Sequence, residues 1–394
     1  MILTNKQEEG LRVAVARYKA GEAWTCISGY AGSGKSTLVK FIIAALDVDP
    51  ESVCYVAYTG KAATVLRQKG CENAMTAHKL LYKAYLTPEG KYMYTPKDSF
   101  EQDYQILVVD EVSMLPKEMW HLLLSHRIYV LALGDPGQLP PVNPEDDNHV
   151  LDNPHVFLDE IMRQAQESEI IRLSMHVREG LPLSSFKATG AQVQIFSPYQ
   201  VSTGMYEWAD QILCATNATR ASINSTMREL RGYGQKPEIG DKIISEHNHW
   251  NTESVSGDWA LTNGTIGTLT EYATNKIWLP SYISKTPLEI MTASFDVFDT
   301  DEFIDVDIDY KKFLTGEATL NPKQKYQMKK AKRCPEAPYE FDYAYAITCH
   351  KAQGSEWDKV MVIEESFPTD PIIRKRWLYT AATRAKEKLV LITK

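Results

Sequence analysis

The sequence predicts an α/β protein in which two parallel-sheet units follow one another along the chain. Short apolar segments alternate with helical stretches through the first half, and a second series of such segments begins after residue 210. This alternation is typical of a parallel sheet with helices on both faces. The expected strands are 24–28, 53–57, 106–109 and 128–133 in the first unit, and 212–215, 360–363 and 389–392 in the second. At 394 residues the chain can hold two or three domains.

The first expected strand runs into a glycine-rich loop. Residues Gly29–Ser36 match G-x-x-x-x-G-K-[ST], a loop that presents backbone N–H groups to a polyphosphate. An amphipathic helix over 37–46 follows, and its N-terminus adds partial positive charge. Lys35 would reach the β- and γ-phosphates, and the Ser36 hydroxyl would hold Mg²⁺. A chance glycine-rich turn is the alternative, which the strand–loop–helix order disfavours. The loop therefore predicts nucleotide binding, but it does not indicate which process nucleotide hydrolysis would power.

Two acidic residues, Asp110 and Glu111, follow the expected strand 106–109. Asp110 suits Mg²⁺ coordination, and Glu111 suits the orientation or deprotonation of an attacking water. Solvated acids at a strand end are a common alternative in isolation. A phosphate loop on a neighbouring strand favours the catalytic interpretation.

Each unit is expected to carry one insertion. Residues 82–104 contain two aromatic strands around a Pro-Glu-Gly turn, and residues 273–338 combine acidic strands with a basic, helix-prone segment. The predicted domains are 1–190 with the 82–104 hairpin, 191–272 together with 339–394, and a β-rich accessory domain over 273–338. Asp305-x-Asp307-x-Asp309 has the spacing of a calcium loop. Tyr310 and Gly316 stand where that loop needs glycine and glutamate, so a half-exposed strand is expected instead.

Composition excludes several classes of protein. A formal net charge of −8 argues against a nonspecific nucleic-acid coat protein, but it allows an enzyme with a positively charged groove. No apolar run reaches the roughly eighteen residues of a membrane span, and the first six residues lack a signal-peptide pattern. The six cysteines show no C-x-x-C pairing, which is typical of reduced thiols in a cytoplasmic protein.

The stretch Gly134–Val142 reads G-D-P-G-Q-L-P-P-V, and together with Asp110–Met114 it resembles motifs II and III of superfamily 1 helicases. The likeness is closer to the 5′-to-3′ branch that contains phage Dda and bacterial RecD. Further segments resemble the family's motifs, in the family's order: 3–7, 59–63, 76–78, 160–164, 214–217, 263–265, 348–356 and 379–385. Tyr58 departs from the family pattern, which has proline there. The resemblance implies two RecA-like motor domains, the first with a β-hairpin (pin) insertion and the second with a small β-rich, SH3-like insertion.

The resemblance also implies ATP and Mg²⁺ as cofactors and assigns roles to individual residues. The implied catalytic residues are Lys35, Asp110, Glu111, Gln138, Arg163, which approaches the γ-phosphate, and Arg384, which is the arginine finger. Nucleotide contacts are implied for Gln7, Gly29, Gly32, Ser33, Gly34, Lys35, Ser36, Thr37, Gly354 and Glu356, and magnesium contacts for Ser36 and Asp110. Contacts to single-stranded DNA are implied for Thr59, His78, Pro140, Pro141, Thr348 and His350.

Two of these roles connect to elementary physical chemistry. Thr4 and Gln7 also form a capping box, an interpretation that can hold together with adenine contact. A positioned guanidinium accelerates phosphoryl transfer by roughly 10³- to 10⁵-fold. Because Arg384 and Arg163 are far from Lys35 in sequence, a cleft between two domains must close to unite them.

Strand separation needs a wedge, since opening a base pair costs on the order of 1–2 kcal/mol. Tyr85, Tyr92 and Tyr94 of the hairpin, with Phe100 nearby, are the candidates, and simple cross-strand packing is the alternative. The basic residues Lys329, Lys330, Lys332 and Arg333 either contact phosphates or form a solvated helix face, which is the commoner outcome.

The function expected from the resemblance is an ATP-dependent DNA helicase that moves 5′ to 3′ on single-stranded DNA and unwinds duplex. Two alternatives remain: an RNA helicase of the Upf type, and a non-motor, ATP-switched DNA-binding protein. The implied partners are single-stranded DNA, a duplex fork and replication or recombination proteins such as a single-strand-binding protein. A monomer in the cytoplasm, or in the host cytoplasm if a phage encodes it, is expected.

Overall fold

The computed structural model describes residues 3–86, 92–141, 144–161, 167–256, 260–297, 301–331 and 334–393. The chain divides into two compact units. The first comprises Met1–Leu81, Lys97–Arg220 and Ile347–Lys394, and the second comprises Tyr82–Pro96 and Ala221–Ala346. Each unit is described by itself.

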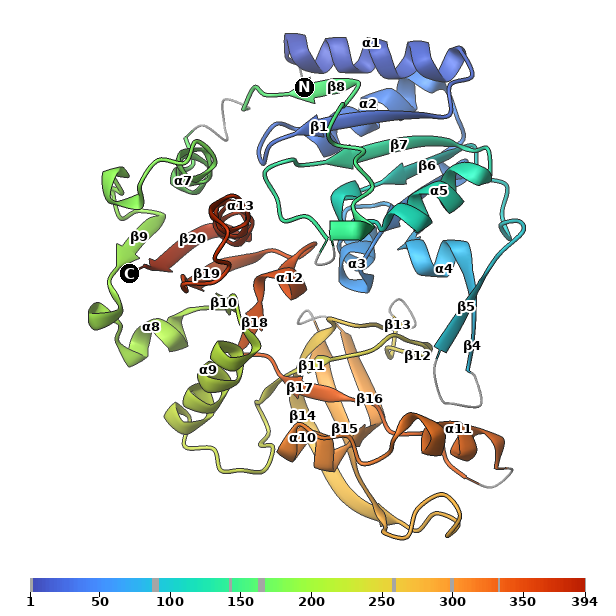
Figure 1. Cartoon of the computed structure of the whole chain (residues 1–394), viewed down its shortest axis with the longest axis vertical. Helices are drawn as coiled ribbons and strands as arrows, with labels where there is room; N and C mark the ends of the chain where they lie inside the picture. Colours follow the sequence, from blue (N-terminus) through green and yellow to red (C-terminus); the bar gives the residue numbers. More distant parts are fainter. Residues whose placement is uncertain are drawn as a thin grey trace. The chain divides into compact units, whose positions relative to one another are not determined.

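The first unit contains two parallel sheets, and the first of them has the strand order β3-β2-β6-β7-β1-β8. Its neighbouring strands pair in parallel throughout. The strands are β1 (Trp24–Gly29), β2 (Val53–Ala57), β3 (Ala74–Thr76), β6 (Ile106–Val109), β7 (Tyr129–Gly134) and β8 (Val156–Leu158). The helices are α1 (Asn5–Lys19), α2 (Lys35–Leu46), α3 (Gly60–Gln68), α4 (Ala77–Leu81) and α5 (Lys117–Ser125). We call this sheet with its helices the first lobe (Figure 1).

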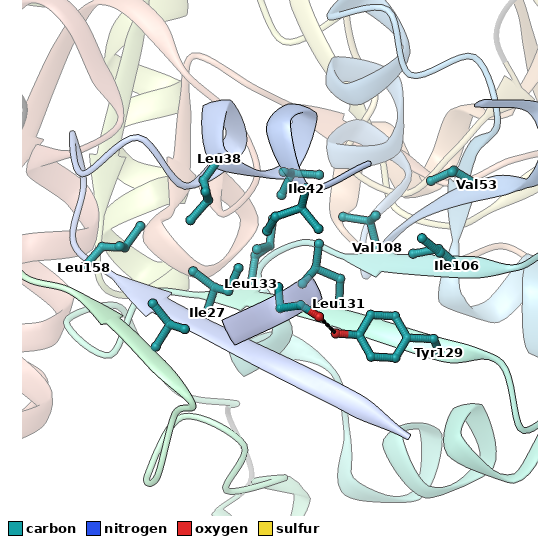
Figure 2. Packing of buried hydrophobic residues seen from close by; sticks show 13 residues of the cluster. Ile27, Leu38, Ile42, Val53, Ile106, Val108, Tyr129, Leu131, Leu133 and Leu158 are labelled. Carbon is teal, nitrogen blue, oxygen red and sulfur yellow. Dashed lines mark hydrogen bonds between the residues drawn. The ribbon is translucent and has the colours of Figure 1, made fainter. Parts of the chain in front are cut away.

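The core of the first lobe lies between α2 and the sheet. Leu38 and Ile42 point from α2 toward Leu131 and Leu133 of β7, and all four are almost fully buried (Figure 2). Tyr129 brings a polar group into this core, and its hydroxyl contacts the carbonyl of Ala14 at 3.2 Å and the Thr25 hydroxyl at 2.6 Å. Because strands of a parallel sheet are covered on both faces, they are almost wholly apolar, which is why the sequence reveals them.

The second sheet has the strand order β18-β10-β19-β20-β9, and its registered pairs are parallel. The strands are β9 (Val193–Phe196), β10 (Gln211–Cys214), β18 (Ala346–Thr348), β19 (Trp357–Ile363) and β20 (Ala385–Ile392). The helices are α7 (Glu169–Arg178), α8 (Thr203–Trp208), α12 (Cys349–Ala352) and α13 (Pro371–Ala382). We call this group the second lobe. The predicted α/β class with two parallel sheets is confirmed.

Helix α7 lies in the second lobe, although its residues fall inside the predicted first domain, 1–190. It packs against α13, β20 and β9. The Glu169 carboxylate accepts hydrogen bonds from the backbone N–H groups of Thr189, Gln192 and Val193. This carboxylate binds the start of α7 to the segment that leads into β9, a contact that apolar periodicity does not reveal.

The second unit is built on a five-stranded antiparallel sheet of order β16-β15-β14-β11-β17. Its strands are β11 (Lys242–Ser245), β14 (Ile266–Ile277), β15 (Leu288–Val297), β16 (Asp301–Asp309) and β17 (Phe341–Tyr343). The sheet reaches beyond the predicted limits 273–338 because β11 and β17 complete its edge. Phe295, Phe303 and Phe341 form its aromatic centre. Helices α10 (Tyr310–Thr315) and α11 (Pro322–Lys330) follow β16, and α9 (Asn217–Leu230) enters this unit from the first.

The acidic segment forms a strand, as expected, but its alternation is interrupted. Phe303, Val306 and Ile308 are buried, whereas Ile304 is 54% exposed. Asp305 has a left-handed backbone, with φ of 53°, where the pairing of β15 with β16 shifts register. This irregularity changes the face of the sheet on which successive side chains lie.

Two small antiparallel pairs complete the second unit: β12 (His249–Glu253) with β13 (Ala260–Leu261), and β4 (Tyr82–Leu86) with β5 (Tyr92–Pro96). The predicted aromatic hairpin is therefore present, and its turn, residues 87–91, lies outside the described residues. Among the helices described here, none is long and apolar enough to cross a lipid bilayer.

Candidate nucleotide site

A cavity of about 980 Å³ lies at the carboxyl ends of β1, β6 and β7 in the first lobe, and the second lobe contributes to its wall. This is where ligands bind in open parallel sheets. The wall includes residues from the phosphate loop, from the ends of β6 and β7, and from the turns before β19 and β20. Those expected from the sequence are Gly32, Gly34, Lys35, Ser36, Thr37, Thr59, Asp110, Glu111, Gln138, Gly354, Glu356 and Arg384.

The phosphate loop depends on glycine at particular positions. Gly32 and Gly34 have φ of 78° and 79°, a region that L side chains rarely adopt. A Cβ at Gly29 would lie 2.7 Å from the Ser33 hydroxyl and 2.9 Å from the Leu158 carbonyl oxygen, so only glycine fits at the end of β1. The Ser33 hydroxyl is buried and has no partner among the described residues.

Lys35 is the first residue of α2 and folds back over its own loop. Its Nζ donates to the carbonyls of Gly29 at 2.6 Å and Tyr30 at 3.1 Å. Burial lowers the pKa of Lys35, while the negative charges of Asp135, Asp110 and Glu111 oppose that shift. The ammonium is thus held among carboxylates inside the cavity, where an anionic ligand would stabilise its charge.

Asp110 and Glu111 lie where β6 ends. The Asp110 carboxylate accepts the Glu111 N–H at 2.9 Å, and the Asp110 N–H donates to the Val56 carbonyl. Glu111 has an αL backbone with φ of 48°, a sparsely populated conformation for a non-glycine residue. Burial raises the pKa of both carboxyls. Glu111 Oε2 is buried without a partner in the described part of the chain.

Arg384 reaches the same cavity from the second lobe. Its Nη1 lies 3.6 Å from Glu111 Oε1, and its positive charge opposes the burial-driven rise in the pKa of Glu111. The guanidinium is 4% exposed and donates to the carbonyls of Thr380 and Ser355 and to the Thr383 hydroxyl. Lys35 and Arg384, far apart in the sequence, therefore face one space.

Gln138, Gly354 and Glu356 also line the cavity, as their motifs led us to expect. The side-chain amide oxygen of Gln138, Oε1, is buried and has no partner within the described ranges. Gly354 has φ of 74°, and a Cβ there would lie 2.6 Å from the Ala62 Cβ of α3. This turn of the second lobe thus packs directly on the first.

Of the residues implied in nucleotide contact or catalysis, Gln7, Gly29 and Ser33 are not part of the described cavity wall. Gln7 forms the predicted capping box with Thr4, and its side-chain amide donates to the Ser33 carbonyl at 3.1 Å. It therefore contacts the phosphate loop from α1, and contact with adenine stays a prediction. Arg163 lies outside the described residues.

The residues implied in DNA contact are divided between the lobes. Thr59 caps α3 by accepting the Ala62 N–H and also borders the cavity, and His78 belongs to α4. Thr348 is the N-cap of α12, and His350 lies within that helix. Pro140 and Pro141 follow Leu139, and both are half-buried. Burial lowers the pKa of both histidines.

The aromatic candidates for the wedge separate into two groups. Tyr85 and Tyr94 of the hairpin are 48% and 44% exposed, and the Tyr94 ring packs edge-on against Tyr82. Phe100 is not part of the hairpin, which ends at Pro96. It stacks on His126 at 4.2 Å, at the end of α5, and its share in the pin stays a prediction.

The sequence analysis assigned no role to several residues that join the lobes at this cavity. Tyr379 and Thr380 of α13 bind the loop after β7, and Gln353 donates to the Leu139 carbonyl at 3.2 Å. Lys61, only 8% exposed, lies over the Trp357 ring at 4.2 Å. Tyr379, Thr380 and Gln353 lie within recognised motifs, but a motif does not reveal which neighbour each one meets.

The fold and the cavity define the class of this protein: an α/β protein with a phosphate-loop motif and two RecA-like parallel-sheet lobes. A model of the AAA domain matches residues 3–196, and one of the UvrD-like helicase C-terminal domain matches residues 343–392.

Sequence similarity to individual proteins is more specific than the two domain models. An ATP-dependent RecD2 DNA helicase of Deinococcus radiodurans is 25% identical over 97% of this chain and 49% of its own length. The ATP-dependent DNA helicase dda of Enterobacteria phage T4 is 30% identical over 36% of this chain and 34% of its own. The chain thus spans about half the length of the first relative and a third of the second. These matches confirm the resemblance to superfamily 1 helicases of the Dda and RecD type.

Solved structures support the fold. A Pif1 helicase from Bacteroides, in complex with ADP-AlF3 and ssDNA, superposes with a TM-score of 0.58 at 18% identity, covering 100% of this chain and 93% of that one. Pif1 helicase from Candida albicans gives a TM-score of 0.53 at 18% identity, covering 100% and 95%. At this identity the likeness establishes the architecture alone.

Proposed function

We propose that this chain is an ATP-dependent DNA helicase that moves 5′ to 3′ along single-stranded DNA and unwinds duplex. The observation that carries the proposal is the meeting of Lys35, Asp110, Glu111 and Arg384 around one cavity from two lobes. A switch protein needs a phosphate loop and its acids. An arginine finger from a second lobe, here Arg384, would in addition couple hydrolysis to movement between the lobes.

The cavity wall fits a magnesium–triphosphate complex. Ser33, Glu111 and Gln138 carry buried polar atoms that lack partners among the described residues, and a polar ligand would satisfy them. No group of three or more histidine, cysteine or acidic side chains that could hold a metal occurs within the described ranges. Ser36 and Asp110 would therefore share Mg²⁺ with phosphate oxygens, and the bound ion would neutralise phosphate charge.

Different side chains would then have different roles in hydrolysis. Glu111 orients the attacking water and accepts its proton, a role for which a carboxyl with a raised pKa is suited at neutral pH. Lys35 and Arg384 stabilise the charge that spreads over the transferred phosphoryl group. Gln138 would sense that group, and Arg163 would approach the γ-phosphate, as its motif implies.

Relative movement of the two lobes would be transmitted to the DNA through Leu139. Its N–H donates to the Thr380 hydroxyl at 2.9 Å, and its carbonyl accepts from Gln353. Both partners belong to the second lobe, and Pro140 and Pro141 follow directly. A change in the separation of the lobes would therefore displace these prolines, which supports their proposed contact with the strand.

The proposed grip on DNA is mainly uncharged. Burial lowers the pKa of His78 and His350, so both imidazoles are neutral at physiological pH and would hold phosphates as N–H donors. Thr59 and Thr348 offer hydroxyls beside them. A grip of this kind is compatible with a chain whose net charge is −8.

The setting of this activity follows from the same proposal. The partners would be single-stranded DNA, a fork and replication or recombination proteins, and the motor would act as a monomer. The six cysteines are free thiols, which supports a reducing compartment such as the cytoplasm.

Duplexes with a single-stranded tail on one strand test the proposal, with the Lys35→Ala variant as the control for contaminating helicases. We expect ATP-dependent unwinding of the 5′-tailed DNA duplex only, and ATPase activity that single-stranded DNA stimulates strongly. Unwinding of the 3′-tailed duplex alone would refute the polarity. Unwinding of 5′-tailed RNA alone would favour the Upf-type alternative, and turnover indifferent to DNA, without unwinding, would favour the switch.

A further inference from the structure

One buried hydroxyl joins three segments at the cavity. Tyr379 of α13 is 1% exposed, and its hydroxyl donates to Asp135 Oδ2 at 2.6 Å. The Tyr379 hydroxyl oxygen also accepts the Ala31 N–H of the phosphate loop at 2.9 Å. Asp135 is itself buried, and its Oδ1 accepts the Gly137 N–H at 2.8 Å. The phosphate loop, the loop after β7 and the second lobe therefore meet at one side chain.

The ring of Tyr379 is fitted as closely as its hydroxyl. A Cβ at Gly137 would lie 3.0 Å from the Tyr379 ring, a contact so close that the ring would have to shift by a few tenths of an ångström. Burial raises the pKa of Tyr379, and the negative charge of Asp135 adds to that shift. The phenol is therefore protonated at physiological pH and can act as the donor to Asp135.

The position of Tyr379 along α13 connects it to the finger. The next residue, Thr380, accepts the Leu139 N–H with its hydroxyl, and its carbonyl accepts from Arg384 Nε at 3.1 Å. Displacement of Tyr379 from Asp135 would therefore move the segment that holds Arg384 beside Glu111.

We propose that Tyr379 is a positioning residue that binds the phosphate loop to the loop after β7 and thereby sets the approach of Arg384 to the transferred phosphoryl group. The inference rests on the proposed ATPase function and deepens it. Tyr379 would not contact the reacting atoms. It would favour the closed arrangement of the lobes in which Lys35 and Arg384 act together.

The test compares Tyr379→Phe with Tyr345→Phe as a matched control. Tyr345 also makes a buried tyrosine–aspartate hydrogen bond, to Asp241 Oδ1 at 2.8 Å, but in the second unit. Steady-state ATPase assays with saturating single-stranded DNA give kcat and KM. Binding of ADP with and without aluminium fluoride, and thermal unfolding, are measured in parallel.

We expect Tyr379→Phe to lower kcat by about tenfold with KM changed by less than about twofold, because the lost bond acts on the closed state. The preference for ADP–aluminium fluoride over ADP should fall by a similar factor. Tyr345→Phe should lower the melting temperature at least as much and leave both quantities unchanged.

Equal kcat values for Tyr379→Phe and the parent, or equal losses in the two variants, would overturn the role of Tyr379 while leaving the proposed function intact. An Asp135→Asn variant adds a second constraint. Its effect and that of Tyr379→Phe should not be additive, and full additivity would overturn the inference. A parent chain that hydrolyses no ATP with or without DNA would overturn both proposals.

Discussion

Replacement of Arg384 by alanine tests directly whether the second lobe contributes a side chain to hydrolysis at the first lobe. The guanidinium is already held by Thr380, Thr383 and Ser355 and lies 3.6 Å from Glu111, so little reorganisation precedes its action. A preorganised arginine of this kind is worth about 10³- to 10⁵-fold in phosphoryl transfer. Arg384→Ala should therefore raise the activation free energy by about 4–7 kcal/mol.

The same substitution changes the pH dependence of the residual activity. Burial raises the pKa of Glu111, and Arg384 is the foremost influence that lowers it. Without Arg384 that pKa rises further. Because Glu111 must be ionised to accept a proton, the pH at which activity appears should move upward. Arg384→Lys, which keeps the charge but not the planar set of donors, should lose rate with a smaller shift in the profile.

Single-turnover ATP hydrolysis, measured with saturating single-stranded DNA between about pH 6 and 9, gives both quantities. Arg374→Ala is the matched control, since Arg374 lies on α13 and pairs with Glu364 at 2.8 Å away from the cavity wall. The control should keep the parental rate. An Arg384→Ala rate within tenfold of the parent, or a profile that does not move, would refute the reasoning.

Three further predictions concern other side chains. Glu111→Gln should abolish turnover yet raise the melting temperature by about 2–4 °C. The reason is that the buried, ionised carboxylate destabilises the fold at neutral pH. Thermal unfolding measures this change, and a lower melting temperature would contradict the prediction. Glu169→Gln should lower the free energy of unfolding by about 1.5–3 kcal/mol at neutral pH, since three backbone N–H groups hold the carboxylate and its pKa is about 2. That pKa lies below the ordinary value of 4.5, so the contribution is present above pH 4.5 and lost as pH falls toward 2; urea titrations that differ equally at pH 7 and near pH 2 would contradict it. Replacing Tyr85 and Tyr94 together by alanine should leave DNA-stimulated ATPase activity within about twofold and slow unwinding by about tenfold; equal losses in both assays would remove the pin from the mechanism.

Much of the first lobe was predictable because its signals are local. The strand before Gly29, the left-handed glycines of the loop and the acids after β6 follow from rules that operate over a few residues. The capping box of Thr4 and Gln7 is another case. Each of these features is set by backbone conformation or by burial on both faces of a strand, so neighbouring residues are sufficient to reveal it.

The sequence did not reveal the features that contacts between distant segments decide. Phe100 follows an aromatic hairpin in sequence, yet its ring stacks on His126. Helix α7 lies before the expected junction of the domains, yet it packs with α13 in the second lobe. Strands β11 and β17 lie outside the expected insertion and still complete its sheet. Apolar periodicity identifies an element but not the surface that buries it.

The sequence alone predicted that this protein binds a nucleoside triphosphate, because Gly29–Ser36 matches a loop whose backbone N–H groups suit a polyphosphate. It also placed Arg384 in a recognisable motif. Only the tertiary structure decided that Arg384 lies beside Glu111 and that the Tyr379 hydroxyl bridges Ala31 and Asp135. Hydrogen bonds and ion pairs across the cavity depend on angstrom-scale distances between lobes, and those distances are fixed by the packing of the whole first unit.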